Sequence, residues 1–165
     1  ELLTAINNPF RKGMVKMNRA VICYYSSHHH NTEKLVKGAA EGLPVDIVDI
    51  TKTKSKDLSG YALVVFASGI YYGRMHPSIG FFIKNSKLEK GQKALVMSTA
   101  GCTFVDFTKG IQALLSSLGV EVEDTFRCKG FDTYGPFGLI GGICKGHPSE
   151  EDIERAGAWL RKNMK

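Results

Sequence analysis

From residue 19 onward the sequence alternates short apolar runs with longer amphipathic runs, and this alternation constrains the fold more than any other feature. The apolar runs are rich in β-branched and aromatic residues, as is typical of buried strands, whereas the amphipathic runs have helical spacing. Five strands are predicted, at residues 20–25, 45–50, 62–67, 93–97 and 120–127. Helices are predicted at 32–43, from Pro77 through Ile83, at 104–118 and at 149–163.

Strands that alternate with helices of this length form right-handed β-α-β units, whose strands lie parallel in one sheet. We therefore predict a three-layer α/β fold built on a doubly wound, five-stranded parallel sheet. A length of 165 residues suits one domain with a single sizeable core. Residues 1–18 are predicted to form an N-terminal arm, and residues 19–165 the domain.

Composition narrows the class of protein. Hydrophobic residues make up 43% of the chain and charged residues 23%, as in soluble globular domains. No apolar run approaches the roughly 20 residues of a membrane helix. The N-terminus also lacks the layout of a signal peptide. We therefore expect a cytoplasmic protein that has no membrane partner.

Charge and cysteine spacing argue against two further classes. The net charge of +6 comes from scattered lysines rather than from a run of like charges. This pattern favours a solvated basic surface over nucleic-acid binding. The four cysteines fit no zinc-binding spacing, and we expect reduced thiols with structural or incidental roles.

The first predicted strand runs into a short polar loop that opens a helix and comprises Ser26, Ser27, His28, His29, His30, Asn31 and Thr32. A helix start has unpaired N–H groups and the positive end of the helix dipole, so it binds phosphate well. Ser27, Asn31 and Thr32 add side-chain donors, and the histidine rings donate or add charge when protonated. One alternative is a helix cap that binds nothing. A metal site is disfavoured, because adjacent residues in a tight loop point apart and no carboxylate cluster completes a shell.

Small and aromatic residues follow the third and fourth predicted strands. The first of these loops contains Ser68, Gly69, Ile70, Tyr71, Tyr72 and Gly73, and the second contains Ser98, Thr99, Ala100, Gly101 and Cys102. Glycines let a backbone approach a flat ligand closely, and tyrosine rings can stack on it. An ordinary loop with surface tyrosines is the alternative for the first loop. We expect Cys102 to pack or to line the site, with a redox role as the alternative.

Ligands of open α/β sheets bind beyond the carboxyl ends of the strands, where the winding direction reverses. The three loops therefore predict a site with a phosphate end and an aromatic end, which suits a nucleotide with a flat ring system. Neither the dinucleotide fingerprint nor the P-loop motif is present. Residues 130–147, called here the glycine-rich segment, are long for a connecting loop, and their aromatic residues predict an ordered, functional structure.

The loop from Tyr25 to Glu33, which follows an apolar strand, resembles the FMN phosphate loop of flavodoxins. The stretch from Gly130 to Pro148 resembles a flavodoxin-like family of short prokaryotic proteins. The resemblance covers about residues 19–163 and implies the strand order 2-1-3-4-5, with FMN between strands 1 and 3. It implies phosphate contacts from residues 27–32 and a flavin ring held between residues 69–73 and 98–101, with Tyr71 or Tyr72 stacked on the ring.

The chain departs from the flavodoxin pattern in two ways. His30 stands where flavodoxins usually have glycine, and His28 and His29 replace hydroxyl residues. Flavodoxins are also strongly acidic, whereas this chain has a pI of about 9.1. A redox partner protein selected by charge would therefore be acidic.

We accordingly predict an FMN-binding electron-transfer protein and favour a carrier over a stand-alone enzyme. The nearest alternative is an FMN-dependent NAD(P)H:quinone or flavin oxidoreductase, in which the glycine-rich segment forms a wall of the substrate pocket. A receiver-type signalling domain is a non-redox alternative, but Tyr24-Tyr25-Ser26 and Ser68 replace the carboxylates that would hold Mg²⁺. A nucleic-acid-binding module is a minor option, since no recognition motif is present.

Overall fold

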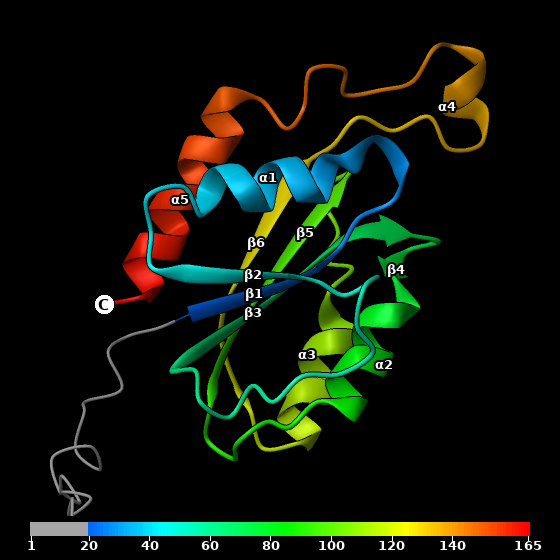
Figure 1. Cartoon of the computed structure of the whole chain (residues 1–165). Helices are drawn as coiled ribbons and strands as arrows, with labels where there is room; N and C mark the ends of the chain where they lie inside the picture. The colour runs from blue at the N-terminus through cyan, green and yellow to red at the C-terminus, as the bar shows by residue number, and fades with distance from the viewer. Residues whose placement is uncertain (1–19) are drawn as a thin grey trace, which may run out of the picture.

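The computed structural model describes residues 20–165, and the predicted N-terminal arm lies outside these residues. Five parallel strands form the sheet in the order β2-β1-β3-β5-β6, and the short β4 pairs antiparallel with β3 (Figure 1). The strands are β1 (Ala20–Tyr25), β2 (Val45–Asp49), β3 (Leu63–Tyr71), β4 (Arg74–Met75), β5 (Lys93–Ala100) and β6 (Glu121–Lys129). With β4 set aside, this is the predicted order 2-1-3-4-5, so the three-layer α/β prediction is confirmed.

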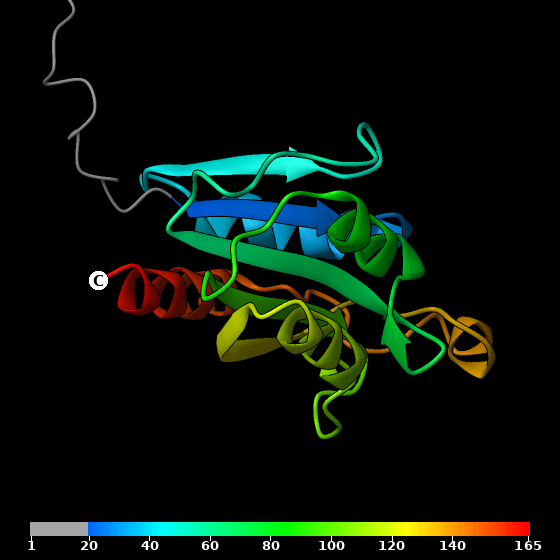
Figure 2. The ribbon, with the colours of Figure 1, turned by 90° about the horizontal axis from the view of Figure 1, so that it is seen from below.

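Helices cover both faces of the sheet. In Figures 1 and 2, α1 and α5 lie on one face and α2 and α3 on the other. The helices are η2 (His28–His30), α1 (Asn31–Ala39), α2 (Pro77–Asn85), α3 (Lys109–Ser117), α4 (Pro136–Leu139) and α5 (Glu150–Asn163). None of the helices between residues 20 and 165 is both long and apolar enough to span a bilayer.

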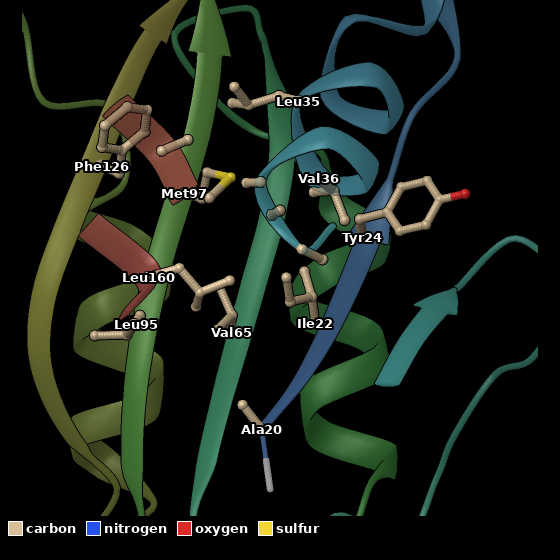
Figure 3. Packing of buried hydrophobic residues seen from close by; sticks show 14 of the residues in the cluster. Ala20, Ile22, Tyr24, Leu35, Val36, Val65, Leu95, Met97, Phe126 and Leu160 are labelled. Atoms are coloured by element: carbon tan, nitrogen blue, oxygen red, sulfur yellow. The ribbon is translucent and has the colours of Figure 1, made fainter. Parts of the chain in front are cut away.

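The core is divided into two clusters by the sheet. Ala20, Ile22 and Tyr24 of β1 point to the cluster under α1 and α5 (Figure 3). Val21 and Cys23 point to the cluster under α2 and α3. Because successive side chains of a strand point to opposite faces, a strand covered on both sides must be apolar throughout, which explains the continuous apolar runs in the sequence.

Two predicted boundaries differ from the structure. The helix predicted at 104–118 begins only at Lys109, because Phe104 is exposed and the carboxylate of Asp106 accepts hydrogen bonds from the backbone N–H and the hydroxyl of Thr108. The third strand extends to Tyr71, beyond its predicted end at residue 67. This extension carries the Gly69–Tyr72 backbone outward and turns it back through β4.

Register aligns the ends of the three central strands. Ser68 of β3 pairs with Tyr25 of β1 on one side and with Ser98 of β5 on the other. The loops that leave these strands therefore start from one row at the same edge of the sheet. Figures 1 and 2 show β4 and α4 at the same end of the molecule, and Figure 1 also shows the start of α1 there.

Candidate functional site

A cavity of about 530 Å³ lies at this carboxyl edge, within the usual size range of small-molecule pockets. All three predicted loops contribute to its lining. The predicted residues that line it are Ser26, His29, Asn31, Thr32, Gly69, Ile70, Tyr71, Tyr72, Gly73, Thr99, Ala100, Gly101 and Cys102. The structure therefore brings most of the predicted site residues around one space.

Other predicted site residues do not line the cavity. Ser68 is fully buried, and its hydroxyl donates to the carbonyl of Gly69 and accepts from the N–H of His76. Ser98 is also buried. Both serines therefore lie within the fold beneath the loops and do not face a ligand. The side chain of His28 lies outside the described part of the structure.

The loop before α1 is held in an unusual backbone conformation. His29 and His30 have φ values of 55° and 52°, in the left-handed region that favours glycine. His30 is also the residue that departs from the glycine usual in flavodoxins. Its Nδ1 lies 2.9 Å from a carboxylate oxygen of Glu33, whereas Nε2 of His29 lies 2.9 Å from the hydroxyl of Thr133. The two described imidazoles thus turn to different partners.

Two side chains that were predicted as phosphate donors have structural partners instead. The amide of Asn31 donates to the carbonyl of Phe131 at 2.8 Å, and the hydroxyls of Thr32 and Thr99 lie 2.8 Å apart in a buried pair. These contacts fix the start of α1 against the glycine-rich segment and β5. At this end the cavity therefore faces the backbone at the start of the helix and the hydroxyl of Ser26, which accepts from the N–H of Glu33.

Two tyrosines at the opposite end have different environments. Tyr71 reaches back to Ser27, with 2.8 Å between the hydroxyls, and its ring packs edge-on against His76. Tyr72 is 81% exposed, and its ring packs edge-on with that of Tyr134, with centroids 5.2 Å apart. A hydrogen bond from the Tyr72 side chain raises the pKa of Tyr134. Of the two, Tyr72 has the more accessible ring face.

His76 lies behind the lining. Its ring stacks on Tyr25 with centroids 3.7 Å apart, and its Nδ1 accepts a hydrogen bond from the N–H of Ser78. Burial lowers the pKa of His76, so the ring is neutral at pH 7 and carries its proton on Nε2. A neutral His76 stabilises the position of Tyr71 without adding charge to the site.

The glycine-rich segment forms the far wall, which the individual motifs did not identify residue by residue. Its lining residues, together with one from the 103–108 loop, are Phe107, Gly130, Phe131, Asp132, Thr133, Tyr134 and Gly135. An isolated bridge between Asp132 and Ile143 folds the segment back on itself. The signal in the sequence was its length and aromatic content, since its contacts come from residues about 100 positions away.

The lining fits a ligand that has a phosphate at one end and a flat ring at the other. The phosphate end lies at the start of α1, a helix of nine residues. The ring end has backbone from Gly69 to Gly73 and the ring of Tyr72. Asp132 is the only carboxylate among the described lining residues, and its Oδ1 accepts from the N–H of Tyr134. Little negative charge therefore opposes a phosphate.

Comparisons with known proteins agree with this geometry. The flavodoxin domain family model matches residues 22–134. An uncharacterised protein of Methanocaldococcus jannaschii is 43% identical over 150 residues, which cover 89% of this chain and 99% of that protein.

Two solved structures share the fold. One is a flavodoxin from the domain Archaea, with a TM-score of 0.56 and 14% identity over 88% of this chain and 98% of that chain. The other is a flavoprotein of Lactobacillus acidophilus in complex with FMN, with a TM-score of 0.51 and 14% identity over 66% of this chain and 92% of that one. Together with the family match over residues 22–134, the fold and the site show that this chain belongs to the flavodoxin domain family.

Proposed function

We propose that this protein binds one FMN in the cavity at the carboxyl edge of the sheet and acts as an electron carrier. The observation that supports this most strongly is the meeting of three loops around one cavity, with a helix start at one end and an exposed tyrosine at the other. The Lactobacillus acidophilus flavoprotein, which shares the fold, was crystallised with FMN. When bound, FMN supplies the redox chemistry, and the protein supplies binding, orientation and electrostatics.

The phosphate is proposed to bind at the start of α1. The first backbone N–H groups of a helix lack intrahelical acceptors, and the helix dipole favours an anion there. The hydroxyls of Ser26 and Ser27 lie in the same loop, and Ser27 would exchange its contact with Tyr71 for a phosphate oxygen. The Asn31 and Thr32 side chains keep the loop in place.

The isoalloxazine ring is proposed to lie between the loops that follow β3 and β5. Gly69 and Gly73 allow the backbone to approach the ring, and residues 99–102 border its other edge. Tyr72 is the proposed stacking residue, because Tyr71 is held by Ser27 and His76. The glycine-rich segment excludes water from the side opposite the β3 loop.

The proposed redox partner is an acidic protein. In the segments 69–76, 100–108 and 129–147, the exposed charged side chains are Arg74, Lys129 and Lys145, all cations. The two carboxylates there, Asp106 and Asp132, are half-buried and accept hydrogen bonds. Exposed apolar side chains, including Phe104 and Leu139, occur in the same segments. An acidic partner whose contact surface has an apolar centre would complement both the exposed cations and the exposed apolar side chains of these segments.

Reconstitution with FMN tests the proposal. The purified chain should bind one equivalent of FMN, with quenching of flavin fluorescence and retention of the yellow spectrum after gel filtration. The Tyr72→Ala variant should raise the Kd of FMN by about 2- to 13-fold, because a stacked aromatic pair contributes about 0.5–1.5 kcal/mol. The Phe81→Ala variant is the matched control, since this exposed side chain on α2 is absent from the cavity lining. Absence of FMN binding by the native chain would refute the proposal.

An FMN-dependent oxidoreductase is the second candidate, favoured by the additional wall that residues 130–135 give the cavity. Such an enzyme would accept hydride from NAD(P)H and pass electrons to a quinone or to free flavin. Anaerobic stopped-flow mixing of the FMN-loaded protein with NADPH separates the candidates. Flavin bleaching within milliseconds to seconds indicates the oxidoreductase, whereas bleaching only by dithionite indicates a carrier.

A further inference from the structure

Two of the four cysteines lie on neighbouring segments beside the cavity. Cys102 is exposed and belongs to the cavity lining. Cys144, from the glycine-rich segment, is half-buried, and its thiol donates to the carbonyl of Gly101 at an Sγ–O distance of 3.4 Å. That carbonyl belongs to the peptide bond that leads directly into Cys102. Cysteines 42 positions apart in the sequence therefore lie on two segments that touch at Gly101, one of the lining residues of the cavity.

The fold brings these segments together by a close approach at Gly101. A Cβ at this position would lie 2.8 Å from Oδ2 of Asp132 and 2.9 Å from Cδ1 of Ile143. The bridge between Asp132 and Ile143 then holds Cys144, the next residue, against the Gly101 carbonyl. The absence of a side chain at Gly101 is thus what allows the two cysteine-bearing loops to touch.

The hydrogen bond to Gly101 limits how far the Cys144 thiol can lie from the backbone of Cys102. Standard bond lengths place a carbonyl oxygen about 2.8 Å from the Cα of the next residue, so Sγ of Cys144 is within roughly 6 Å of Cys102 Cα. A disulfide needs a Cα–Cα distance of about 4.4–6.8 Å, so the Cys144 thiol has to turn from the Gly101 carbonyl toward Cys102 for the bond to form. Both cysteines lie outside regular helices and strands, so a rotamer change and a small loop movement can close the bond.

The other two cysteines provide an internal contrast. Cys23 and Cys128 are buried, in β1 and β6, and burial raises the pKa of each thiol to about 12. The thiolate is the reactive form, so these two groups are inert at neutral pH. Cys102 and Cys144 are thus the two cysteines of the chain that are not buried.

We propose that Cys102 and Cys144 form a dithiol–disulfide couple that exchanges two electrons with the flavin, an inference that rests on the proposed FMN binding. In the oxidising direction two S–H bonds break and one S–S bond forms. The two electrons and two protons released pass to the oxidised flavin, which becomes fully reduced. The reverse direction delivers electrons from the reduced flavin to the disulfide. A thiol or disulfide substrate that reaches Cys102 would then exchange with this couple.

The disulfide is tested first on the protein without FMN. The chain is equilibrated in glutathione buffers of graded redox ratio, free thiols are alkylated, and unreduced tryptic peptides are analysed by mass spectrometry. The expected product is 2 Da lighter and joins the peptides of Cys102 and Cys144, while Cys23 and Cys128 are alkylated only after unfolding. Cys102→Ser and Cys144→Ser should each abolish this product. Absence of the Cys102–Cys144 link in every buffer would overturn the proposal.

Coupling to the flavin is tested with FMN-loaded protein under anaerobic conditions. The disulfide form, reduced at the flavin by one equivalent of dithionite, should regain its yellow absorbance as two free thiols appear. The flavin of the Cys102→Ser variant should stay bleached. Bleached flavin beside an intact disulfide in the native protein would overturn the coupling. Failure of FMN to bind at all is scored separately and refutes the proposed function, because the disulfide is measured without FMN.

Discussion

At the scale of single residues, Gly101 determines how closely the glycine-rich segment approaches the cavity. The clash that a Cβ would make with Asp132 and Ile143 leads us to expect that Gly101→Ala pushes this segment outward. Overpacking of this kind should lower the free energy of unfolding by about 1–3 kcal/mol. The Kd of FMN should rise, because the far wall shifts. Urea unfolding and fluorescence titration measure the two effects.

Gly110 offers the matched control for that substitution. It lies in α3, is exposed, and a Cβ there would meet nothing within 4 Å. Gly110→Ala should stabilise the fold by about 0.5 kcal/mol through helix propensity and should leave the Kd of FMN unchanged. If Gly101→Ala bound FMN as tightly as Gly110→Ala does, the close approach at Gly101 would have no role in shaping the cavity.

Individual side-chain roles in the site could be predicted from the sequence only in part. The positions of the loops followed from the rule that parallel strands end at one edge, so residues such as Gly69 and Thr99 were found. The partners of Asn31 and Thr32 could not be found, because they come from Phe131 and Thr99, far along the chain. A polar residue in a loop looks like a ligand donor until its distant partner is known.

At the scale of elements, the start of α5 depends on a capping box. Ser149 and Asp152 exchange hydrogen bonds, and the carboxylate of Asp152 also contacts Nδ1 of His147. Burial raises the pKa of Asp152, but the hydrogen bonds from Ser149 and His147 outweigh it and lower the pKa below 3.8. Asp152→Asn should therefore reduce the free energy of unfolding at pH 7 by about 1 kcal/mol.

The stability difference between the native chain and Asp152→Asn should depend on pH. A carboxyl group whose pKa is lower in the folded state stabilises the fold above its unfolded pKa, and this contribution is lost as the pH falls through the folded value. The difference between the native chain and Asp152→Asn should thus shrink below about pH 4. Glu150→Gln, an exposed change in the same turn, should cost less than about 0.5 kcal/mol. A difference that is constant from pH 7 to pH 2 would contradict the ionised capping role.

Helices and strands were predicted correctly where the pattern of apolar residues was strong. The start of a helix was misplaced where exposed apolar residues happened to fit helical spacing. The continuous apolar run of residues 20–25 predicted a buried strand, and the structure has β1 there, buried on both faces. The predicted helix began at Phe104 and included Val105, yet both side chains are exposed in the loop between β5 and α3. Sequence spacing alone does not distinguish an apolar residue that is exposed on the surface from one that is buried in the core.

At the scale of the whole molecule, the order of the five parallel strands could be predicted because right-handed crossovers leave few ways to wind them. The closure of the site by the glycine-rich segment could not. That closure depends on contacts such as His29 with Thr133 and Cys144 with Gly101, which join segments over 40 positions apart. The local pattern of apolar residues predicts the sheet and its helices, whereas the position of the glycine-rich segment depends on packing between segments that are distant in the sequence.

The net charge of +6 predicts how the whole molecule selects partners. With FMN bound and reduced, it should transfer electrons rapidly to a small acidic iron–sulfur protein at low salt, and the second-order rate should fall as ionic strength rises. Basic cytochrome c should show the opposite salt dependence, because like charges repel and salt screens the repulsion. Stopped-flow measurement between 10 mM and 500 mM salt compares the two acceptors. Equal salt dependence for both would show that the cations at the mouth, such as Arg74 and Lys129, do not guide docking.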